Sequence, residues 1–451
     1  MPEIFLLLGI FYIFASTKRS SFFFQLRPNS LFDMKKYLFL LLSLFLIAPL
    51  QAQVIIYGLV TDDVSGNAIA DAQIRIPGTN LSTLSNADGR FTLRLDSVPA
   101  RLDASAVGYR NAVVRKPRIE ESLRYEVGSR NRELKIMLHP TATMLKDVFV
   151  YSPDNILQAA IEKIKVNYRQ SPETYSAFYR ETIRKRKTYV GVSEAVVNMY
   201  KRSYEEDPDY DQVHILKGRT LASQRQRDTL SVHVQGGPRE ALFLGFVKNR
   251  YMLLNEEVLQ CYKLEIETPQ TINDRPQYVI SFTPTISLPD EPLYYGLIYI
   301  DYATLSFTRI EMNLDVTDRY KATKVMLARK PLGMRFRPRG LQTIVNYYYD
   351  GQHSDIAYMR TTYNFDCDWK KRGIAVKYEA VSEMLVTDHH ATTEQPRRRD
   401  SFRRSDVLGK KVSDFEDPDF WEEYNILQPS ESLENAVKKL KKINDKENKK
   451  K

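Results

Sequence analysis

Residues 55–95 read IIYGLVTDDVSGNAIADAQIRIPGTNLSTLSNADGRFTLRL, and no other part of the chain has a more informative pattern. Short runs in which every second residue is apolar are separated by clusters of Asp, Gly and Asn. Strands with one buried face show this alternation, and the polar clusters supply the tight turns that join them. The stretch therefore predicts a small antiparallel β-sandwich.

The same residues resemble the carboxypeptidase regulatory-like domain, a transthyretin-like sandwich of seven strands. The resemblance is carried by Gly58-x-Val60-x-Asp62, Ala70–Ile74, Gly78-Thr79 and Asn86–Phe91. Although the domain is named after carboxypeptidases, it is a non-catalytic accessory module, so the resemblance implies a role in envelope architecture. We expect this sandwich over residues 53–140.

Residues 34–52 have the three parts of a secretory signal peptide. Lys35 and Lys36 form a basic start, an apolar run of about a dozen residues follows, and Ala52 precedes a plausible cleavage point. The run is shorter than the roughly 20 residues that a membrane-spanning helix needs. We therefore expect an exported protein, in the periplasm or associated with the outer membrane, whose mature chain begins near Gln53.

Residues 1–33 do not fit this export signal, because they contain a second apolar run. We interpret them as an upstream extension from a mis-assigned start, with a tethered N-terminus as the alternative. The 451-residue sequence as a whole has ordinary globular composition, 43% hydrophobic and 27% charged. Its 28 tyrosines against 2 tryptophans favour β structure, since Tyr suits pleated, half-buried surfaces.

The net charge is +10, and part of the excess lies in the lysine-rich segment 438–451. Such a tail could contact an anionic membrane surface, although a solvated, disordered end is the commoner outcome. An exported protein meets little nucleic acid, so we expect no nucleic-acid partner. Cys261 and Cys367 could form a disulfide in an oxidising compartment, and buried free thiols fit the sequence equally well.

Beyond the sandwich the hydrophobic period changes twice. Residues 141–173 are expected to form a linker and a helix with Asp154 as its N-cap. Residues 174–388 alternate again in many short runs and predict a larger curved antiparallel sheet or half-barrel with a few covering helices. An insertion at about 202–258 is expected to cover one face of the sheet. Residues 389–451 should contain a basic loop, a C-terminal helix and the Lys-rich tail.

This second half resembles the uncharacterised β-rich region that follows the sandwich in exported proteins of Gram-negative bacteria. The resemblance is carried by residues 175–183, Gly296–Asp301, Phe307–Glu311 and Asp419–Tyr424. The segments GLIYID and FTRIE are also similar to the half-barrel of periplasmic lipoprotein carriers, in which a curved sheet and a helix bury acyl chains. Neither resemblance brings a catalytic motif, so it implies binding rather than catalysis.

The sequence lacks the motifs of the common hydrolases and nucleotide-binding enzymes. No histidine has a glutamate three residues downstream, and the His-Glu-x-x-His, Gly-x-Ser-x-Gly and phosphate-loop patterns are absent. We therefore predict no catalytic, cofactor-binding or metal-binding residue, and no cofactor. The six histidines are His139, His214, His233, His353, His389 and His390.

Three weaker candidates remain. Asp388–His390 could bind a metal ion, but neighbouring residues of a strand point apart, so a solvated turn is favoured. The alternating aspartates of residues 207–211 resemble calcium ligands but lack the glycine and distal glutamate of the loop consensus. Tyr347–Tyr349 and Tyr294-Tyr295 could contact a sugar or a lipid, although cross-strand packing is the commoner role of such residues.

These observations favour a non-catalytic exported envelope protein, a binding or assembly module that holds a lipid, a glycan or an outer-membrane protein partner. The alternative is an unrecognised hydrolase, glycosidase-like or peptidase-associated, with two carboxylates about 5–9 Å apart in the β domain. A membrane barrel is least favoured, because the strands carry charges such as Arg309 and Glu311. A sheet filled by its own side chains would exclude the lipid version.

Overall fold

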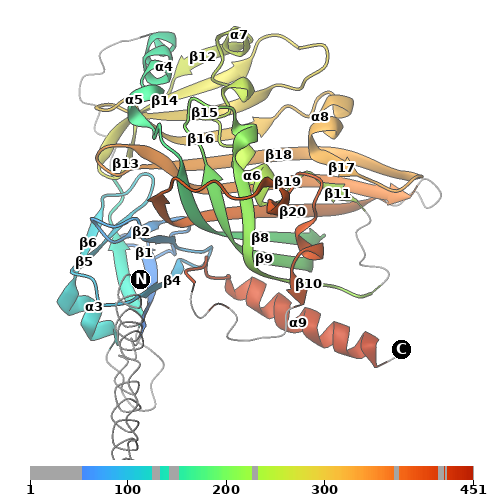
Figure 1. Cartoon of the computed structure of the whole chain (residues 1–451), viewed down its shortest axis with the longest axis horizontal. Coiled ribbons are helices and arrows are strands. Elements are labelled where there is room, and N and C mark those ends of the chain that lie inside the picture. The colour runs from blue at the N-terminus through green and yellow to red at the C-terminus, as the bar shows by residue number, and fades with distance from the viewer. Residues whose placement is uncertain are drawn as a thin grey trace, which may run out of the picture. The chain divides into compact units, whose positions relative to one another are not determined.

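The computed structural model describes residues 53–123, 133–141, 152–225, 232–369, 375–414, 421 and 424–449, which belong to one compact unit (Figure 1). The predicted signal peptide and the extension before it lie outside the described residues, as does most of the predicted linker at 141–151. The fold is mainly β, as predicted, and consists of a small sandwich and one large sheet.

The small sandwich has the seven predicted strands, arranged as a three-stranded sheet in the order β4-β1-β7 and a four-stranded sheet in the order β3-β2-β5-β6. Helix α3 (Lys116–Leu123) follows the sixth strand. The strands are β1 (Val54–Asp62), β2 (Gln73–Arg75), β3 (Ser82–Leu84), β4 (Arg90–Leu95), β5 (Arg101–Ser105), β6 (Ala112–Arg115) and β7 (Leu134–Leu138).

The glycines and apolar residues of the sandwich explain its sequence pattern. Ile56, Gly58 and Val60 of β1 are buried, whereas Tyr57 and Leu59 between them are half-buried. This is the alternation expected of a strand with one buried face. Gly58 faces the ring of Phe91 so closely that an added Cβ would lie 2.2 Å from two ring carbons. Gly89 has a φ of +74°, a conformation that favours glycine in the turn before β4.

The large sheet has twelve strands in the described part of the chain, in the order β12-β14-β15-β16-β18-β19-β20-β8-β9-β10-β21, with β13 paired to β14. It is open rather than closed into a barrel. Its strands are β8 (Glu173–Lys185), β9 (Thr188–Lys201), β10 (Gln212–Ala222), β12 (Tyr262–Ile266), β13 (Gln270–Ile272), β14 (Arg275–Pro284), β15 (Tyr294–Asp301), β16 (Phe307–Leu314), β18 (Met334–Tyr349), β19 (Ser354–Trp369), β20 (Val376–Ala391) and β21 (Ser413–Asp414).

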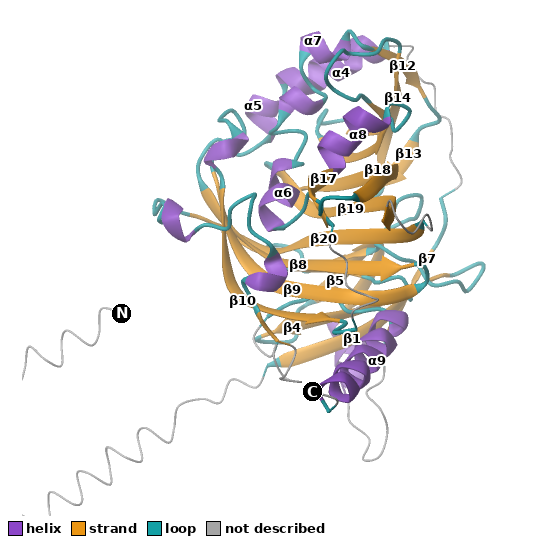
Figure 2. Cartoon of the chain, turned by 90° about the vertical axis from the view of Figure 1, so that its right-hand side faces the viewer, coloured by secondary structure: helices purple, strands orange, loops and turns teal. Residues whose placement is uncertain are grey.

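Both faces of this sheet carry apolar side chains, and different parts of the chain cover them (Figure 2). On the first face, alternate residues of β8 such as Tyr175 and Tyr179 pack under helices and their connections. On the second face, Phe178 packs against Leu84 of the sandwich and against the C-terminal segment. The first-face covers include α4 (Pro153–Glu162), α5 (Ile164–Asn167), α6 (Pro238–Phe243), η3 (Arg250–Met252) and α7 (Glu256–Leu259).

The predicted insertion at 202–258 is only partly a cover. Residues 212–222 form strand β10, which extends the sheet by pairing with β9, so the prediction is wrong for this part. The charged residues of β10 hid its alternation, because the strand is largely half-buried rather than buried on one face. Helix α6 begins at Pro238, as the position of a proline in a first helical turn predicts.

Two helix predictions need correction. The N-cap of α4 is Ser152 rather than Asp154, because Pro153 takes the first helical position and moves Asp154 into the first turn. The lysine-rich segment is not a disordered end, since helix α9 spans Glu431–Asn448. Leu433 and Leu440 are buried on one side of α9. This apolar side packs against the protein, so the helix continues into the lysine-rich part of the sequence.

The segment before α9 joins the sandwich to the large sheet. Trp421 and Leu427 pack with Phe178 in the apolar cluster on the second face. Asn425 imitates a neighbouring strand, because its side chain accepts a hydrogen bond from the Arg94 nitrogen and donates one to the Arg94 carbonyl. The segment therefore covers an edge of the sandwich that would otherwise be open to pairing.

A buried ion pair lies where the C-terminal segment packs on the large sheet. The side chains of Arg180 and Glu194, on β8 and β9, are 2% and 4% exposed and lie 2.8 Å apart. Arg180 also donates to the carbonyl oxygen of Leu427, and Arg219 of β10 lies 2.9 Å from the second oxygen of Glu194. Two guanidinium groups thus share one carboxylate beneath the C-terminal segment.

Replacing Glu194 with Gln should lower the free energy of unfolding by about 3–5 kcal/mol, because buried guanidinium groups would lose their counter-charge. Urea unfolding of the variant measures this loss. Glu265→Gln is the matched control, since the Lys263–Glu265 pair is 63% and 56% exposed; its change should stay within about 1 kcal/mol. Equal losses in the two variants would contradict the role given to Glu194.

Candidate functional site

A cavity of about 520 Å³ lies on the first face of the large sheet. Strands β8, β19 and β20 supply its floor. Its cover consists of the paired strands β11 (His233–Val234) and β17 (Leu327–Arg329), the turn before α6, and residues 404–411 with the short helix η5 (Leu408–Lys410). The volume falls within the range of about 300–1,000 Å³ typical of small-molecule sites.

The floor of the hollow includes small residues as well as larger ones such as Ile183 and Tyr363. Elsewhere on the first face, large side chains such as Tyr175 and Phe307 fill the space beneath the helices. At the cavity, β20 contributes Ala380 and Ser382, and the cover contributes Gly236 and Gly237. The lining combines aliphatic side chains, such as Ile183, Val232 and Leu408, with polar and charged ones.

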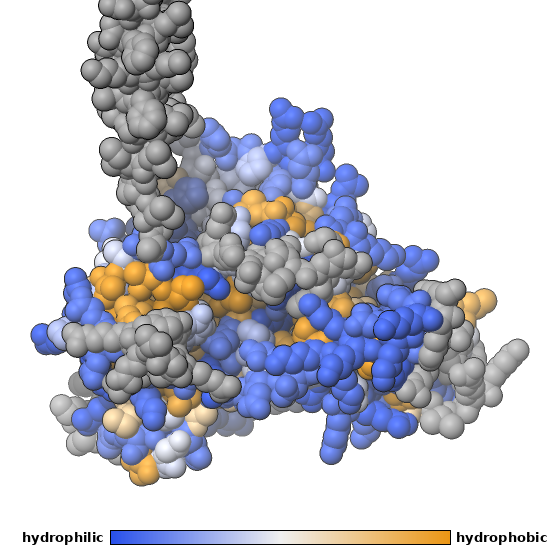
Figure 3. All heavy atoms as spheres, turned by 90° about the horizontal axis from the view of Figure 1, so that it is seen from below, coloured by the Kyte–Doolittle hydropathy of each residue, from blue (hydrophilic) through white to orange (hydrophobic). Residues whose placement is uncertain are grey.

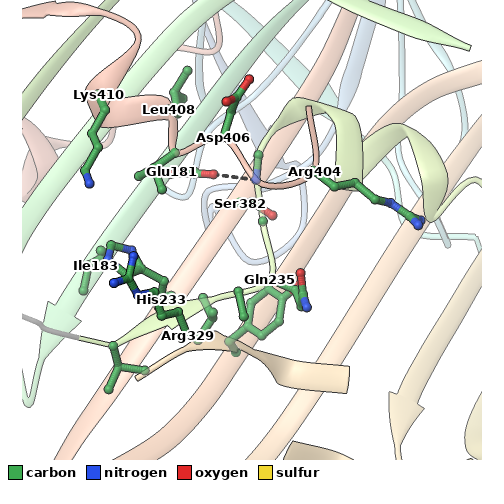
Figure 4. A pocket seen from close by; sticks show the side chains of 18 of the residues that line it. Glu181, Ile183, His233, Gln235, Arg329, Ser382, Arg404, Asp406, Leu408 and Lys410 are labelled. Atoms are coloured by element: carbon green, nitrogen blue, oxygen red, sulfur yellow. Dashed lines mark hydrogen bonds between the residues drawn. The ribbon is translucent and has the colours of Figure 1, made fainter. Parts of the chain in front are cut away.

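Glu181 is a half-buried acid in the floor of this cavity (Figure 4). Its Oε1 accepts hydrogen bonds of 2.8 Å from the Tyr179 hydroxyl and from the Gly237 nitrogen. Burial raises the pKa of the Glu181 carboxyl, and these two hydrogen bonds oppose the rise. Gly237 has a φ of +91°, and a Cβ there would lie 2.7 Å from the Phe402 ring, so glycine is required at this contact.

Basic side chains surround the same cavity. Arg404 lies 3.2 Å from Glu240, and its guanidinium carbon lies 3.6 Å from the centre of the Phe243 ring. Lys411 pairs with Asp406 at 3.4 Å. His233, Arg329 and Lys410 also line the cavity but take part in neither of these pairs.

A second cavity of about 630 Å³ adjoins the first on the side of α9. The two cavities share five lining residues, namely Glu181, Ile183, Val232, His233 and Val407. Asn444 of α9 holds the helix against the end of β10, because it donates to the Ala222 carbonyl and accepts from the Gln224 nitrogen. The C-terminal helix thus forms one wall of this second compartment.

The histidine pair expected in a solvated turn lies instead on strand β20, so that prediction is wrong. His389 stacks on the ring of Tyr175, with centroids 5.2 Å apart, and its Nδ1 lies 2.8 Å from Glu173 Oε2. His390, the next residue of the strand, is exposed. Strand pairing with β8 extends to these residues, which is why no turn forms there.

The aspartates of residues 207–211 have separate structural roles. Asp207 caps a short helix by accepting from the Asp209 nitrogen, and Asp209 is exposed. Asp211 is buried, 2.5 Å from the Lys248 amine. Among the described residues, no group of three or more acidic, histidine or cysteine side chains is placed to hold a metal ion.

The tyrosine pairs do not form one exposed strip. Tyr347 is buried and its hydroxyl accepts from the Val247 nitrogen, whereas the ring of Tyr348 lies 3.2 Å from the guanidinium carbon of Arg75 in the sandwich. Tyr294 is buried from solvent more than Tyr295, which is 47% exposed. Both cysteines, Cys261 and Cys367, are buried free thiols.

Lys201 is a buried amine outside the cavity. Its Nζ lies 3.1 Å from the centre of the Tyr204 ring and has no hydrogen-bond partner among the described residues. Burial, with a smaller effect of Lys248, lowers the pKa of Lys201 to about 7 from its ordinary 10.5. The amine is thus held by packing and by the carboxylates of the surrounding core rather than by a direct ion pair.

Sequence reasoning did not find the cavity residues. His233 was one of six histidines without a role, and Glu181, Arg329 and Lys410 belong to no motif. They come together only because four distant segments meet over β8 and β20.

No described helix is long and apolar enough to span a membrane.

Residues 55–129 match the family model of the carboxypeptidase regulatory-like domain. The sandwich is therefore a domain of this type, as the sequence predicted, while the model leaves the larger part of the chain unmatched. No curated protein matches the sequence. The resemblance proposed for the second half stays a prediction.

Solved structures similar to this chain are distant. A domain described as that of an outer membrane lipoprotein-sorting protein from Vibrio parahaemolyticus is 11% identical over 54% of this chain and 95% of its own, with a TM-score of 0.24. A LolA superfamily protein from Nitrosomonas europaea is 12% identical over 55% and 96%, with a TM-score of 0.21. The Pseudomonas aeruginosa MucA/MucB complex contains a chain that is 13% identical over 54% of this chain and 99% of its own, with a TM-score of 0.17. TM-scores below 0.5 carry no conclusion about this chain.

Replacing Lys201 with Met should stabilise the protein, and by more at pH 6 than at pH 9. Because the lysine pKa is lower in the folded chain, the unfolded chain binds more protons between pH 7 and 10.5, and stability falls as the pH drops through that window. The penalty is complete below about pH 7. Thermal unfolding at both pH values measures the difference between variant and parent.

The control is Lys263→Met, at a position 63% exposed, which should leave the pH dependence unchanged. A Lys201→Met variant whose melting temperature follows that of the parent protein at every pH would contradict the burial of an uncompensated amine.

Proposed function

We propose that this protein is a non-catalytic, exported envelope protein that binds an amphipathic small molecule of lipid type in the cavity beneath β11, β17 and residues 404–411. The observation that carries the proposal is the cavity itself, a hollow of about 520 Å³ beside the packed part of the sheet face. The ligand therefore occupies one end of the sheet, not the whole concave face.

The rest of the first face excludes a broader lipid-carrying role. Side chains of α4, α6 and the connections after α6 pack directly on the sheet, with Phe246, Val247 and Leu253 completely buried. Protein interiors packed in this way leave no space for a chain-like guest. A lipid would therefore lie between the floor strands β8 and β20 and the cover of the first cavity.

The carboxyl groups of the cavity support binding over hydrolysis. Asp406 accepts from the Arg403 nitrogen and pairs with Lys411. Glu181 is held by Tyr179 and Gly237. A glycosidase-like pair needs one carboxyl group free to donate a proton and another free to attack or activate water.

The exposed surface seen from below is mostly hydrophilic, with separate apolar patches (Figure 3).

The domain limits stay proposals, namely a signal peptide at 34–52, a sandwich at 53–140, a linker and helix at 141–173, a large β domain at 174–388 and a C-terminal part at 389–451. Export to the periplasm or the outer membrane is proposed on the same footing, from the signal-peptide pattern. The sandwich would then be an accessory module, since it packs on the second face of the sheet, opposite the cavity.

Ser382→Phe should abolish binding of a lipid probe by filling the cavity, because Ser382 lines its floor. Fluorescence titration with cis-parinaric acid measures binding, and the expected loss is at least about tenfold in affinity, the equivalent of a displaced apolar contact of some 1.4 kcal/mol. The change adds volume to an existing hollow, so the fold should persist.

Ser281→Phe is the matched control. Ser281 is a half-buried serine on β14 of the same sheet and does not line the cavity, so this variant should bind the probe as the parent protein does. Unchanged binding by Ser382→Phe, or equal loss in both variants, would contradict the assignment of the cavity.

A further inference from the structure

Three basic side chains from three separate segments meet at one end of the first cavity. His233 of β11 lies directly opposite Arg329 of β17 in the strand pairing, and Lys410 of η5 lines the same space. Figure 4 shows Lys410 pointing toward His233 and Arg329, whereas Arg404 points away on the other side of the cavity. The three segments are far apart in the sequence, so the cluster is a product of the fold.

These three groups differ from the other cations of the cavity. Arg404 and Lys411 have carboxylate partners, Glu240 and Asp406. Among the described residues, His233, Arg329 and Lys410 have no carboxylate partner, and all three line the same cavity. Burial lowers the pKa of His233, and Lys410 and Arg329 lower it further by repulsion. Arg329 and Lys410 are exposed at the rim of the cavity, and their positive charge would attract an anion that enters it.

We propose that His233, Arg329 and Lys410 form an anion-binding site, and that the ligand is an amphiphile whose acidic head group lies among them while its apolar part fills the cavity. This inference rests on the proposed function and deepens it, because it names the class of ligand. Arginine and lysine side chains bind phosphate and carboxylate oxygens through charge-assisted hydrogen bonds, and a histidine can add a further donor.

The carboxyl groups of the cavity do not oppose such a ligand. The charge of Asp406 is offset by Lys411. Burial raises the pKa of Glu181, which favours its neutral form, and its Oε1 is engaged by two donors. The free cations therefore outweigh the free carboxylates at the end where the head group would lie.

The test compares three probes by isothermal titration of the full chain: dodecyl phosphate below its micelle concentration, dodecanol, and inorganic phosphate. The parent protein should bind dodecyl phosphate at least about tenfold more tightly than dodecanol, and inorganic phosphate much more weakly than either. The double variant Arg329→Gln, Lys410→Gln should lose this tenfold preference but bind dodecanol as before.

The control is Lys438→Gln, Lys439→Gln, which removes the same charge from exposed positions of α9 outside both cavities and should keep the preference. Equal affinity of the parent for dodecyl phosphate and dodecanol would overturn the anion site and leave the proposed function intact. Binding of inorganic phosphate as tight as that of dodecyl phosphate would show a site for a free anion, overturning the amphiphile. Failure to bind dodecyl phosphate and dodecanol alike would overturn both proposals.

Discussion

The large sheet has two apolar faces, and water has to be excluded from both. An antiparallel sheet commonly leaves one face in solvent, but here Tyr179 and Phe178, neighbours on β8, are both buried on opposite sides. The first face is covered by helices and connections, and the second by the sandwich and the C-terminal segment. Burial of both faces makes the sandwich, the sheet and the C-terminal helix depend on each other.

The same constraint explains the cavity. Covers that come from several distant segments leave a gap, and this gap lies over Ala380 and Ser382. Aliphatic side chains of the lining, such as Ile183 and Leu408, would contact the apolar part of a bound amphiphile. The basic side chains at the end of the cavity have no carboxylate partner in the described part of the chain, so an acidic head group could lie among them.

Much of the fold could be predicted from the sequence, because alternation and turn residues report local structure. The pattern of residues 55–95 predicted a small β-sandwich, its resemblance to a known domain implied seven strands, and Pro238 marked the start of α6. Strand β10 and the position of His389 could not be predicted, since charged edge residues conceal alternation and the pairing of β20 with β8 is a long-range event. The group of basic residues in the first cavity could not be predicted either. His233 and Lys410 are far apart in the sequence, and only the tertiary fold places both in the lining of one cavity.

The most direct test of the proposed amphiphile is native mass spectrometry of the full chain, purified without detergent from the cells that produce it. The cavity and its basic end predict a protein that carries one non-covalent adduct, released on denaturation as a molecule with an aliphatic part and an acidic group. A protein of bare mass that also gains no adduct from an extract of envelope lipids would contradict the account.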